Sequence, residues 1–302
     1  MDPNILSVKK IWDEGIHNAF TDLIRYRGKW WCTFREATDH GWSIGTVRVI
    51  CSEDGEAWES TVVLMEDEVD LRDPKLAVMP DGRLMLVMGG ILYRSTEYWT
   101  RSPRIAFSLD GYEWTAPIKV LAEDHWLWRV TWQGEVAYSV SKLGEGHFPR
   151  RGFLYKSTDG LAWEWICEFF LPNETWTASE TTLRFMPDET MVALVRPDWI
   201  GTSKPPYTEW AWTQIGERMG GPNFMRWSDG TLWASARGRH PEGEPATVLA
   251  RMTETSYEPM LWLPSGGDCS YTGMVEYEGV LWMSYYSSHE GKTSIYLAKI
   301  AV

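Results

Sequence analysis

The chain has 302 residues, the size of one large domain or of two ordinary ones. Its formal net charge of -13 argues against a nucleic-acid partner, because phosphate binding needs a basic surface. No apolar run reaches the length of a membrane span, and the opening stretch MDPNILSVKKIWDEG lacks the apolar core of a signal peptide. These features predict a chain without a membrane span that is cytoplasmic or has lost its signal.

The four cysteines lie far apart and form neither a CxxC nor a zinc-finger spacing, so we expect them to be reduced, buried thiols. The histidines and carboxylates form no recognisable ligand set, so we expect no metal and no other cofactor. Twenty tryptophans are unusually many. Some of them belong to the turns described next, and open indole faces also suit sugar rings.

Along the chain, the first predicted strand is ILSVKKIW at 5–12, and a four-stranded unit then follows. This unit starts with the hairpin LIRYRGKWWCTF and continues with TVRVICS, the turn SEDGEAW at 52–58, and WESTVVLM. In this turn Ser52 and Asp54 can accept hydrogen bonds from backbone amides, while Gly55 can adopt a positive φ. The same phrase returns as SLDGYEW at 108–114 and STDGLAW at 157–163, again between two extended stretches. We therefore expect structural hairpin turns whose tryptophans are mostly buried and lie far from any site.

The first hairpin has five further copies, so the chain contains six units, which start near residues 17, 70, 126, 178, 221 and 268. The copies read LAVMPDGRLMLVM, VTWQGEVAYSV, LRFMPDETMVALV, FMRWSDGTLWASA and MVEYEGVLWMSYY. A period of roughly 40–50 residues with four strands per unit is typical of a β-propeller. The last unit ends at IYLAKIAV with only three strands. The sequence thus predicts one all-β domain over 1–302, a six-bladed propeller of four-stranded antiparallel blades, whose last blade is completed by residues 5–12.

Propeller sites lie at one mouth of the central channel, at the starts of the innermost strands and the ends of the second strands. Aligning the six hairpins on their turns gives the residues at the strand starts, which are His17, Asp73, Arg129, Glu180, Asn223 and Tyr271. The second strands end at Arg35, Gly89, Ser141, Arg196, Arg237 and Tyr286. Charged and polar side chains, three arginines among them, are therefore predicted to converge on one mouth.

The six units with S-x-D-G-x-x-W turns resemble the sialidase (neuraminidase) superfamily, whose Asp-box repeat appears here in a shortened form. The resemblance covers the whole chain. It implies a glycoside hydrolase that removes a terminal acidic sugar from a glycan and retains the anomeric configuration through a tyrosine nucleophile.

The resemblance implies roles for individual residues. Sialidases have a catalytic acid a few residues after an arginine, and FREATDH supplies Arg35 and Asp39. Their second blade often begins Asp-Pro, as LRDPKL does here at Asp73. The remaining matches are a glutamate base, a substrate-binding arginine and a tyrosine nucleophile, which correspond to Glu180, Arg196 and Tyr271.

The chain also departs from the superfamily, which binds the substrate carboxylate with three arginines. Only Arg196 is retained, because NAFTDLI places Ala19 at the first position and GGPNF places Asn223 at the third. Arg35 and Arg237 both end second strands near the same mouth, so we expect them to rebuild a cationic pocket. We expect Asp73, Asn223 and His17 to contact the substrate as well.

Two other functions remain open. A propeller lyase would abstract the proton next to a uronate carboxylate, with His17 and either Tyr271 or Tyr286 as base and acid, and with Arg35 or Arg237 neutralising the carboxylate. A carbohydrate-binding propeller without catalysis is the third possibility. All three predict a glycan or a small acidic sugar as the partner.

Overall fold

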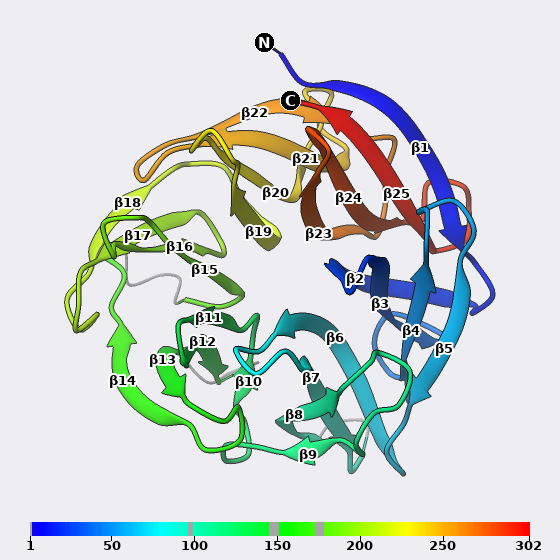
Figure 1. Cartoon of the computed structure of the whole chain (residues 1–302), viewed down its shortest axis with the longest axis horizontal. Coiled ribbons are helices and arrows are strands. Elements are labelled where there is room, and N and C mark those ends of the chain that lie inside the picture. Colours follow the sequence, from blue (N-terminus) through cyan, green and yellow to red (C-terminus); the bar gives the residue numbers. More distant parts are fainter. Residues whose placement is uncertain (1, 96–98, 145–150, 173–177) are drawn as a thin grey trace.

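The computed structural model describes residues 2–95, 99–144, 151–172 and 178–302, and all regular elements in these residues are β-strands. They form six sheets arranged in a ring, with the first strand of each sheet at the centre (Figure 1). The chain is therefore an all-β, six-bladed propeller of four-stranded antiparallel blades, as the sequence predicted. In the third blade the innermost strand is divided into two short segments, which both pair with the next strand. No helix long and apolar enough to cross a membrane occurs in the described part of the chain.

The strands follow one another blade by blade in chain order. The first three blades contain β2 (His17–Tyr26), β3 (Lys29–Ala37), β4 (Thr46–Ser52), β5 (Glu59–Leu64); β6 (Val69–Val78), β7 (Leu84–Tyr93), β8 (Trp99–Ser108), β9 (Ile118–Lys119); and β10 (Trp126–Leu127), β11 (Thr131–Gln133), β12 (Val136–Leu143), β13 (Arg151–Ser157), β14 (Glu164–Phe169). The last three contain β15 (Thr181–Phe185), β16 (Met191–Val195), β17 (Trp199–Ser203), β18 (Ala211–Gln214); β19 (Gly220–Arg226), β20 (Leu232–Arg239), β21 (Pro245–Met252), β22 (Tyr257–Trp262); and β23 (Cys269–Tyr277), β24 (Val280–Ser287), β25 (Ser294–Ala301), β1 (Asn4–Trp12).

The ring is closed by pairing between the two ends of the chain. Strand β1 runs antiparallel to β25, with Asn4 opposite Ala301 and Trp12 opposite Ile295. It forms the outer edge of the last blade, so the two termini lie close together (Figure 1). This pairing covers the edge of β25 that would otherwise be open to another strand.

The repeated seven-residue turns join the third and fourth strands of the first three blades. In the first, Ser52 Oγ accepts a hydrogen bond from the Gly55 amide at 2.8 Å, and Asp54 Oδ1 accepts one from the Glu56 amide at 2.8 Å. The Trp58 indole donates to the Gly55 carbonyl at 3.3 Å. The other two turns repeat these bonds, through Ser108, Asp110, Trp114 and through Ser157, Asp159, Trp163.

The glycine of each turn packs on the preceding blade. A Cβ atom on Gly55 would lie 2.4 Å from the Trp282 ring in the last blade, and one on Gly111 would lie 2.4 Å from the Trp31 ring in the first. Gly160 approaches Met85 in the second blade in the same way, at 3.0 Å. The repeat therefore fastens neighbouring blades together, and glycine is required both for its positive φ and for this close approach. The three tryptophans are half-buried, less than expected, and none of them lines the main cavity described below.

We predict that Gly111→Ala destabilises the protein more than Gly28→Ala. Both glycines have positive φ, 90° and 78°, so both variants incur the strain of a left-handed alanine. Only Gly111 is packed, since nothing lies within 4 Å of a Cβ built on Gly28. Overpacking costs about 1–3 kcal/mol, so the Gly111 variant should lose that much additional free energy of unfolding in urea denaturation. Equal losses of unfolding free energy in the two variants would mean that packing against Trp31 does not limit the size of the residue at position 111.

Candidate active site

One cavity of about 340 Å³ lies at a mouth of the central channel. Its charged lining contains four cationic side chains and two carboxylates, namely Arg72, Arg101, Lys142, Arg196, Asp73 and Glu180. Its aromatic lining comprises Phe20, His40, Trp42, Tyr93, Trp99, Trp126, Trp128 and Tyr271. Cations outnumber carboxylates in this lining although the chain has a net charge of -13. The cavity is therefore suited to an acidic ligand.

Irregularities in the innermost strands turn several of these side chains toward the mouth. Strands β2, β6, β19 and β23 each carry a register shift near the start. A residue with left-handed backbone lies in each shift, and these are Phe20, Asp73, Gly221 and Tyr271, with φ of 65°, 49°, 58° and 53°. A bulge adds one residue to a strand and redirects its side chain, and strained backbone of this kind is frequent at functional sites. A bulge of this kind therefore occurs in the innermost strands of these four blades.

Three predicted residues meet at this mouth, Glu180 and Arg196 from the fourth blade and Tyr271 from the last. The Tyr271 hydroxyl donates a hydrogen bond to Glu180 Oε1 at 2.8 Å, and Arg196 Nη1 donates to the same oxygen at 2.7 Å. Arg196 Nη1 also lies 3.5 Å from the Tyr271 hydroxyl oxygen. The second carboxylate oxygen, Glu180 Oε2, accepts the Gly221 amide at 2.7 Å. Gly221 is required at this place, because a Cβ atom there would lie 2.5 Å from the Tyr271 ring.

The electrostatics of this cluster keep the proton on the tyrosine. Burial would raise the pKa of Glu180, but the charge of Arg196 and the bonds from Gly221 and Tyr271 outweigh it, so this pKa lies below its usual value. Burial and the neighbouring Glu180 charge raise the pKa of Tyr271 well above its usual value. The cluster therefore pairs a neutral phenol with an ionised carboxylate that can accept the phenol proton.

Asp73 differs from Glu180 although both line the cavity. Its Oδ1 atom is buried and has no hydrogen-bond partner. Burial raises the pKa of Asp73, and the charges of Arg72 and Lys75 only partly oppose the effect. Two carboxyls with pKa values displaced in opposite directions therefore share one cavity, an arrangement that suits a proton donor beside a base.

Asp39, the residue matched to the sialidase acid, is placed differently. Its Oδ1 atom accepts the backbone amides of Gly41 and Trp42, both at 2.8 Å, within its own exposed turn. These bonds lower the pKa of Asp39, although slight burial opposes them. Asp39 is not among the residues that line the cavity. A low pKa is the wrong property for a proton donor, so Asp73 fits the acid role better than Asp39 does.

Arg35 is buried and is not among the residues that line the cavity. Its side chain is fully buried, with Nε 2.7 Å from Asp70 Oδ1. Its Nη1 and Nη2 atoms donate to the carbonyls of Asp39 and Ser43, at 2.7 and 2.8 Å. Contrary to the sequence expectation, Arg35 is thus not available to a ligand. It holds the loop that carries His40 and Trp42, both of which do line the cavity.

Asn223 lies deeper in the channel than predicted and is almost fully buried. Its amide donates to the Thr272 carbonyl at 2.9 Å, and its Oδ1 accepts from Arg184 at 3.1 Å. It lines a second cavity further along the axis and not the one that contains Tyr271.

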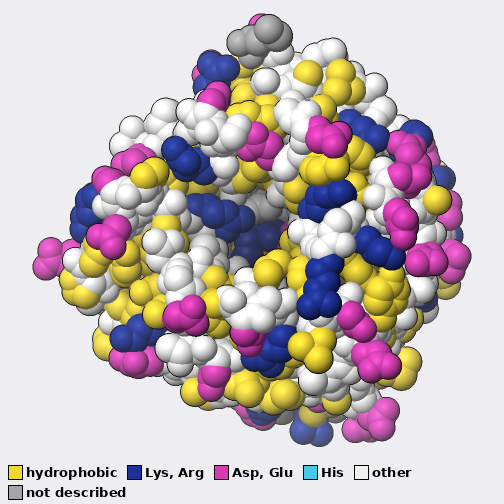
Figure 2. Space-filling model, in the orientation of Figure 1, with side chains coloured by type: hydrophobic (Ala, Val, Ile, Leu, Met, Phe, Trp, Pro, Cys, Tyr) yellow, Lys and Arg dark blue, Asp and Glu magenta, His cyan; other side chains and the backbone are white. Residues whose placement is uncertain are grey.

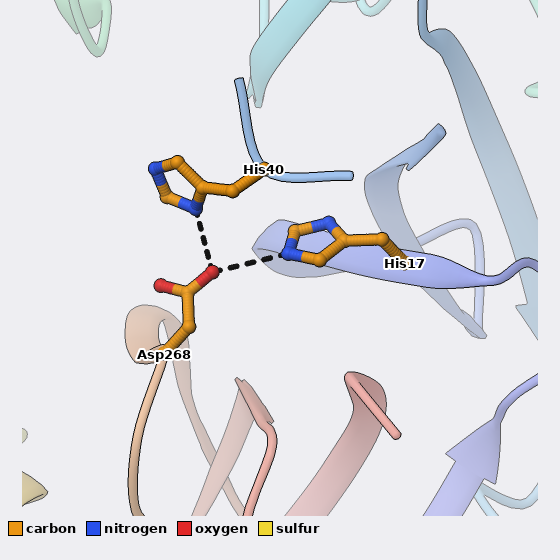
Figure 3. Close-up of side chains that lie close together, drawn as sticks. All are labelled: His17, His40 and Asp268. Atoms are coloured by element: carbon orange, nitrogen blue, oxygen red, sulfur yellow. Dashed lines mark hydrogen bonds and ion pairs between the residues drawn. The ribbon is translucent and has the colours of Figure 1, made fainter. Parts of the chain in front are cut away.

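A carboxylate that the sequence analysis missed organises the other side of the mouth. Asp268 precedes β23 and accepts His17 Nε2 at 3.1 Å and His40 Nδ1 at 2.6 Å, both on Oδ2 (Figure 3). Its Oδ1 accepts the Tyr286 hydroxyl at 2.8 Å and Arg237 Nη1 at 3.2 Å. Burial would raise the pKa of Asp268, but the bonds from the two histidines and Tyr286 lower it far more.

Two residues predicted from the sequence, His17 and Arg237, belong to this network. His17 is buried against Asp268 and does not line the cavity, whereas His40 does. Arg237 is partly exposed beside the cavity, and its guanidinium carbon lies 5.7 Å from the centre of the Tyr271 ring. Asp268 lies three residues before Tyr271 in the sequence and just before β23, so an alignment of equivalent strand positions does not single it out.

His17, His40 and Asp268 also form the one group in the described part of the chain whose ligand atoms could hold a metal ion, all within 4.8 Å of one another. Two observations weigh against this role. Arg237 already neutralises the single carboxylate, and the buried Nδ1 of His17 has no hydrogen-bond partner. A metal-bound histidine usually donates its other N–H to an acceptor. The cluster therefore fits a hydrogen-bonded network better than a metal centre.

Aromatic side chains form the rim of the cavity on the side of the first two blades. Trp42 is 60% exposed, and its ring centre lies 5.4 Å from those of Tyr93 and of Trp99. Open indole faces of this kind suit the apolar faces of sugar rings.

No protein-family model and no curated protein sequence matches the chain. By structure it is similar to a Dyadobacter fermentans protein of unknown function, with a TM-score of 0.88 and 16% identity over 100% of this chain and 99% of that one. It is also similar to Trypanosoma rangeli sialidase in its covalent intermediate with 2,3-difluorosialic acid, with a TM-score of 0.75 and 10% identity. This match covers 98% of the present chain but 59% of the sialidase. A Fusarium graminearum α-L-arabinofuranosidase bound to arabinobiose matches with a TM-score of 0.74 and 14% identity over 98% of this chain and 97% of that chain.

The chain has the sialidase-type propeller fold. Glycoside hydrolases that act on different sugars share this fold, so substrate and mechanism have to be argued from the cavity itself.

We predict that Asp268→Asn lowers the free energy of unfolding by an amount that depends on pH. The folded-state pKa of Asp268 is depressed, so its stabilising contribution is fully present above the unfolded pKa, near 3.9, and is lost as pH falls toward the folded pKa. At about pH 5 the variant should lose about 1–3 kcal/mol of unfolding free energy, because buried donors lose a charged acceptor. Chemical denaturation from about pH 5 down to about pH 3 should show the difference shrinking. A difference independent of pH would contradict the assigned shift.

Proposed function

We propose that the protein is an exo-acting, retaining glycoside hydrolase that removes a terminal acidic sugar from a glycan. The observation that carries the proposal is the 2.8 Å hydrogen bond between Tyr271 and Glu180 in a cavity whose charged lining is mainly cationic. A neutral phenol suits a sugar with a carboxylate on its anomeric carbon, because it approaches without the repulsion that a carboxylate nucleophile would meet.

In the first step the Tyr271 oxygen bonds to the anomeric carbon as its proton passes to Glu180. The bond from the anomeric carbon to the leaving oxygen breaks, and Asp73 gives its proton to that oxygen. In the second step the ionised Asp73 takes a proton from water, which attacks the anomeric carbon and releases the tyrosine. Glu180 returns the proton to the phenolate, so both carboxyls end in their starting states. Arg196 touches Glu180 and Tyr271, and orients them.

The cationic lining supports an acidic substrate even though two of the superfamily's three arginines are missing. Arg72, Arg101 and Lys142 line the cavity together with Arg196. Guanidinium groups bind carboxylates well because they offer charge and paired N–H donors. The aromatic rim around Trp42 would hold the glycan beyond the cleaved bond.

We predict that Tyr271→Phe lowers kcat by at least about 10³-fold, since the nucleophile and its transferable proton are lost together. The fold should remain intact, because phenylalanine fills the same space. Turnover of a fluorogenic sialoside measures the effect, with circular dichroism as the control. Uronides and arabinofuranosides belong on the same substrate panel. Retained turnover in this variant would exclude the tyrosine nucleophile and favour attack by Glu180 or by water.

We predict that Asp73→Asn lowers kcat on natural glycans by about 10²–10⁴-fold. The loss should be much smaller on an aryl glycoside whose phenol leaves without protonation. Asp39→Asn is the matched control and should stay near the wild-type rate on both substrates. The opposite result, with the large loss in the Asp39 variant, would restore the acid implied by the sialidase resemblance.

A second candidate function, the polysaccharide lyase, is favoured by one observation. His40 lines the cavity and is held through Nδ1 by Asp268, as an oriented base would be. A lyase would create an unsaturated uronate that absorbs ultraviolet light, whereas hydrolysis would not. Product spectra from a uronate-containing polysaccharide therefore separate the two functions, and a protein that only binds would give neither product.

A further inference from the structure

A second cavity of about 280 Å³ lies on the axis of the ring, further along the channel than Tyr271. Its lining comes from later parts of the innermost strands, for example Ile24 of β2, Val78 of β6 and Met274 of β23. Because these strands start at the mouth that holds Tyr271, the second cavity faces the other end of the channel. Figure 2 shows an axial hollow with Lys and Arg side chains gathered around it, while acidic side chains lie mostly on the periphery.

The charges at this cavity do not balance. Arg129 Nη1 lies 2.7 and 2.8 Å from the two oxygens of Asp22, so the one carboxylate in the lining is already paired. Arg184 also lines the cavity, but its hydrogen bonds go to the Leu183 carbonyl, the Thr131 hydroxyl and the Asn223 amide oxygen. All three are neutral acceptors. Within the described residues no carboxylate forms an ion pair with Arg184.

A third cation, Lys75, interacts electrostatically with Arg129 and Asp22, although it does not line this cavity. Lys75 is almost fully buried and bonds only to carbonyl oxygens, those of Phe20, Thr21 and Pro74. Burial, and next the charge of Arg129, lower the pKa of Lys75 to about 8. The same two causes lower the pKa of Arg184 to about 9. The negative charge of Asp22 opposes both shifts, as do Asp73 and Glu180 for Lys75, but they do not cancel them. Buried like charges therefore repel one another here, and burying a charge that is only partly compensated is costly.

Unused hydrogen-bonding capacity accompanies the excess charge. Arg129 is 94% buried, and its Nε atom has no hydrogen-bond partner. Buried polar groups are normally satisfied, so an unpaired donor on a residue of the cavity lining points to a missing acceptor. We propose that this second cavity binds a small anion, a halide, phosphate or small carboxylate, between Arg129 and Arg184.

The anion would supply the missing negative charge and accept hydrogen bonds from the two guanidinium groups. It would stabilise the ring at the end away from Tyr271 and take no part in the proposed hydrolysis. A ligand that binds only the folded state raises the melting temperature in a saturable way. Stability, and not activity, is therefore the property to measure.

The experiment compares melting temperatures at constant ionic strength, with sodium gluconate replaced stepwise by chloride, bromide, phosphate or acetate. In the wild-type protein we expect a saturable rise on the order of 2–4 °C for at least one small anion. Arg184→Met keeps the length of the side chain but removes its charge, and should abolish the rise. Arg151→Met is the matched control, because Arg151 is an exposed arginine paired with Glu168 far from the cavity, and should leave the rise unchanged.

A crystal grown with bromide adds a direct readout, since anomalous scattering should place the ion between Arg129 and Arg184. This readout needs only the wild-type protein, so it decides the matter even if Arg184→Met fails to fold. The proposal is overturned if the wild-type protein shows no saturable rise with any of these anions, if all three proteins respond equally, or if the cavity is empty in a crystal grown with the anion that gives the largest rise. The comparison of chloride, phosphate and acetate identifies which class of small anion the cavity prefers.

Discussion

The pairing of β1 with β25 is the interaction on which the rest of the molecule depends. It joins the two ends of the chain within one blade and so fixes the ring at six blades. The Asn18 side chain adds a second link between first and last blades, since its amide donates to the Thr293 carbonyl at 2.8 Å. Only in the closed ring does Tyr271 in the last blade lie beside Glu180 in the fourth. The candidate site is therefore a product of closure, and no single blade could form it.

Residues close together in an innermost strand lie in two different environments, one at the mouth of the channel and one deeper inside it. In β6, Asp73 lies in the bulge at the mouth, whereas Lys75 lies deeper, with its ammonium 6.0 Å from the centre of the Tyr271 ring. In β23, Tyr271 faces the mouth, while the Thr272 hydroxyl lies buried without a partner. The bulges supply this change of direction, since one extra residue shifts the side-chain alternation of a strand. The proposed anion would bind in the deeper cavity, between Arg129 and Arg184. The proposed substrate would bind in the cavity at the mouth, beside Tyr271.

Two carboxylates at the mouth, Glu180 and Asp268, each form a separate set of hydrogen bonds and ion pairs. Glu180 is bonded to Arg196 and Tyr271, and Asp268 to two histidines, Tyr286 and Arg237. The Phe20 ring packs edge-on to Tyr271 of the first group and to His40 and Tyr286 of the second. The two groups also meet directly, because the Tyr271 and Tyr286 ring centres lie 5.9 Å apart.

The sequence by itself determined the fold class, the six blades and the structural nature of the repeated turns, because these follow from local patterns. Alternating strands, tight turns and a phrase such as SLDGYEW are readable without any distant contact. It also identified Glu180, Arg196 and Tyr271 as neighbours, since equivalent positions of repeated blades lie at one end of the ring. Only the tertiary structure decided that Arg35 is buried on Asp70, that Asp39 caps its own turn and that Asp268 joins His17 to His40. The reason is physical: the partner of a charged side chain, and hence its pKa and its exposure, is set by the folded loops, by packing between neighbouring blades and, for Asp268, by closure of the ring.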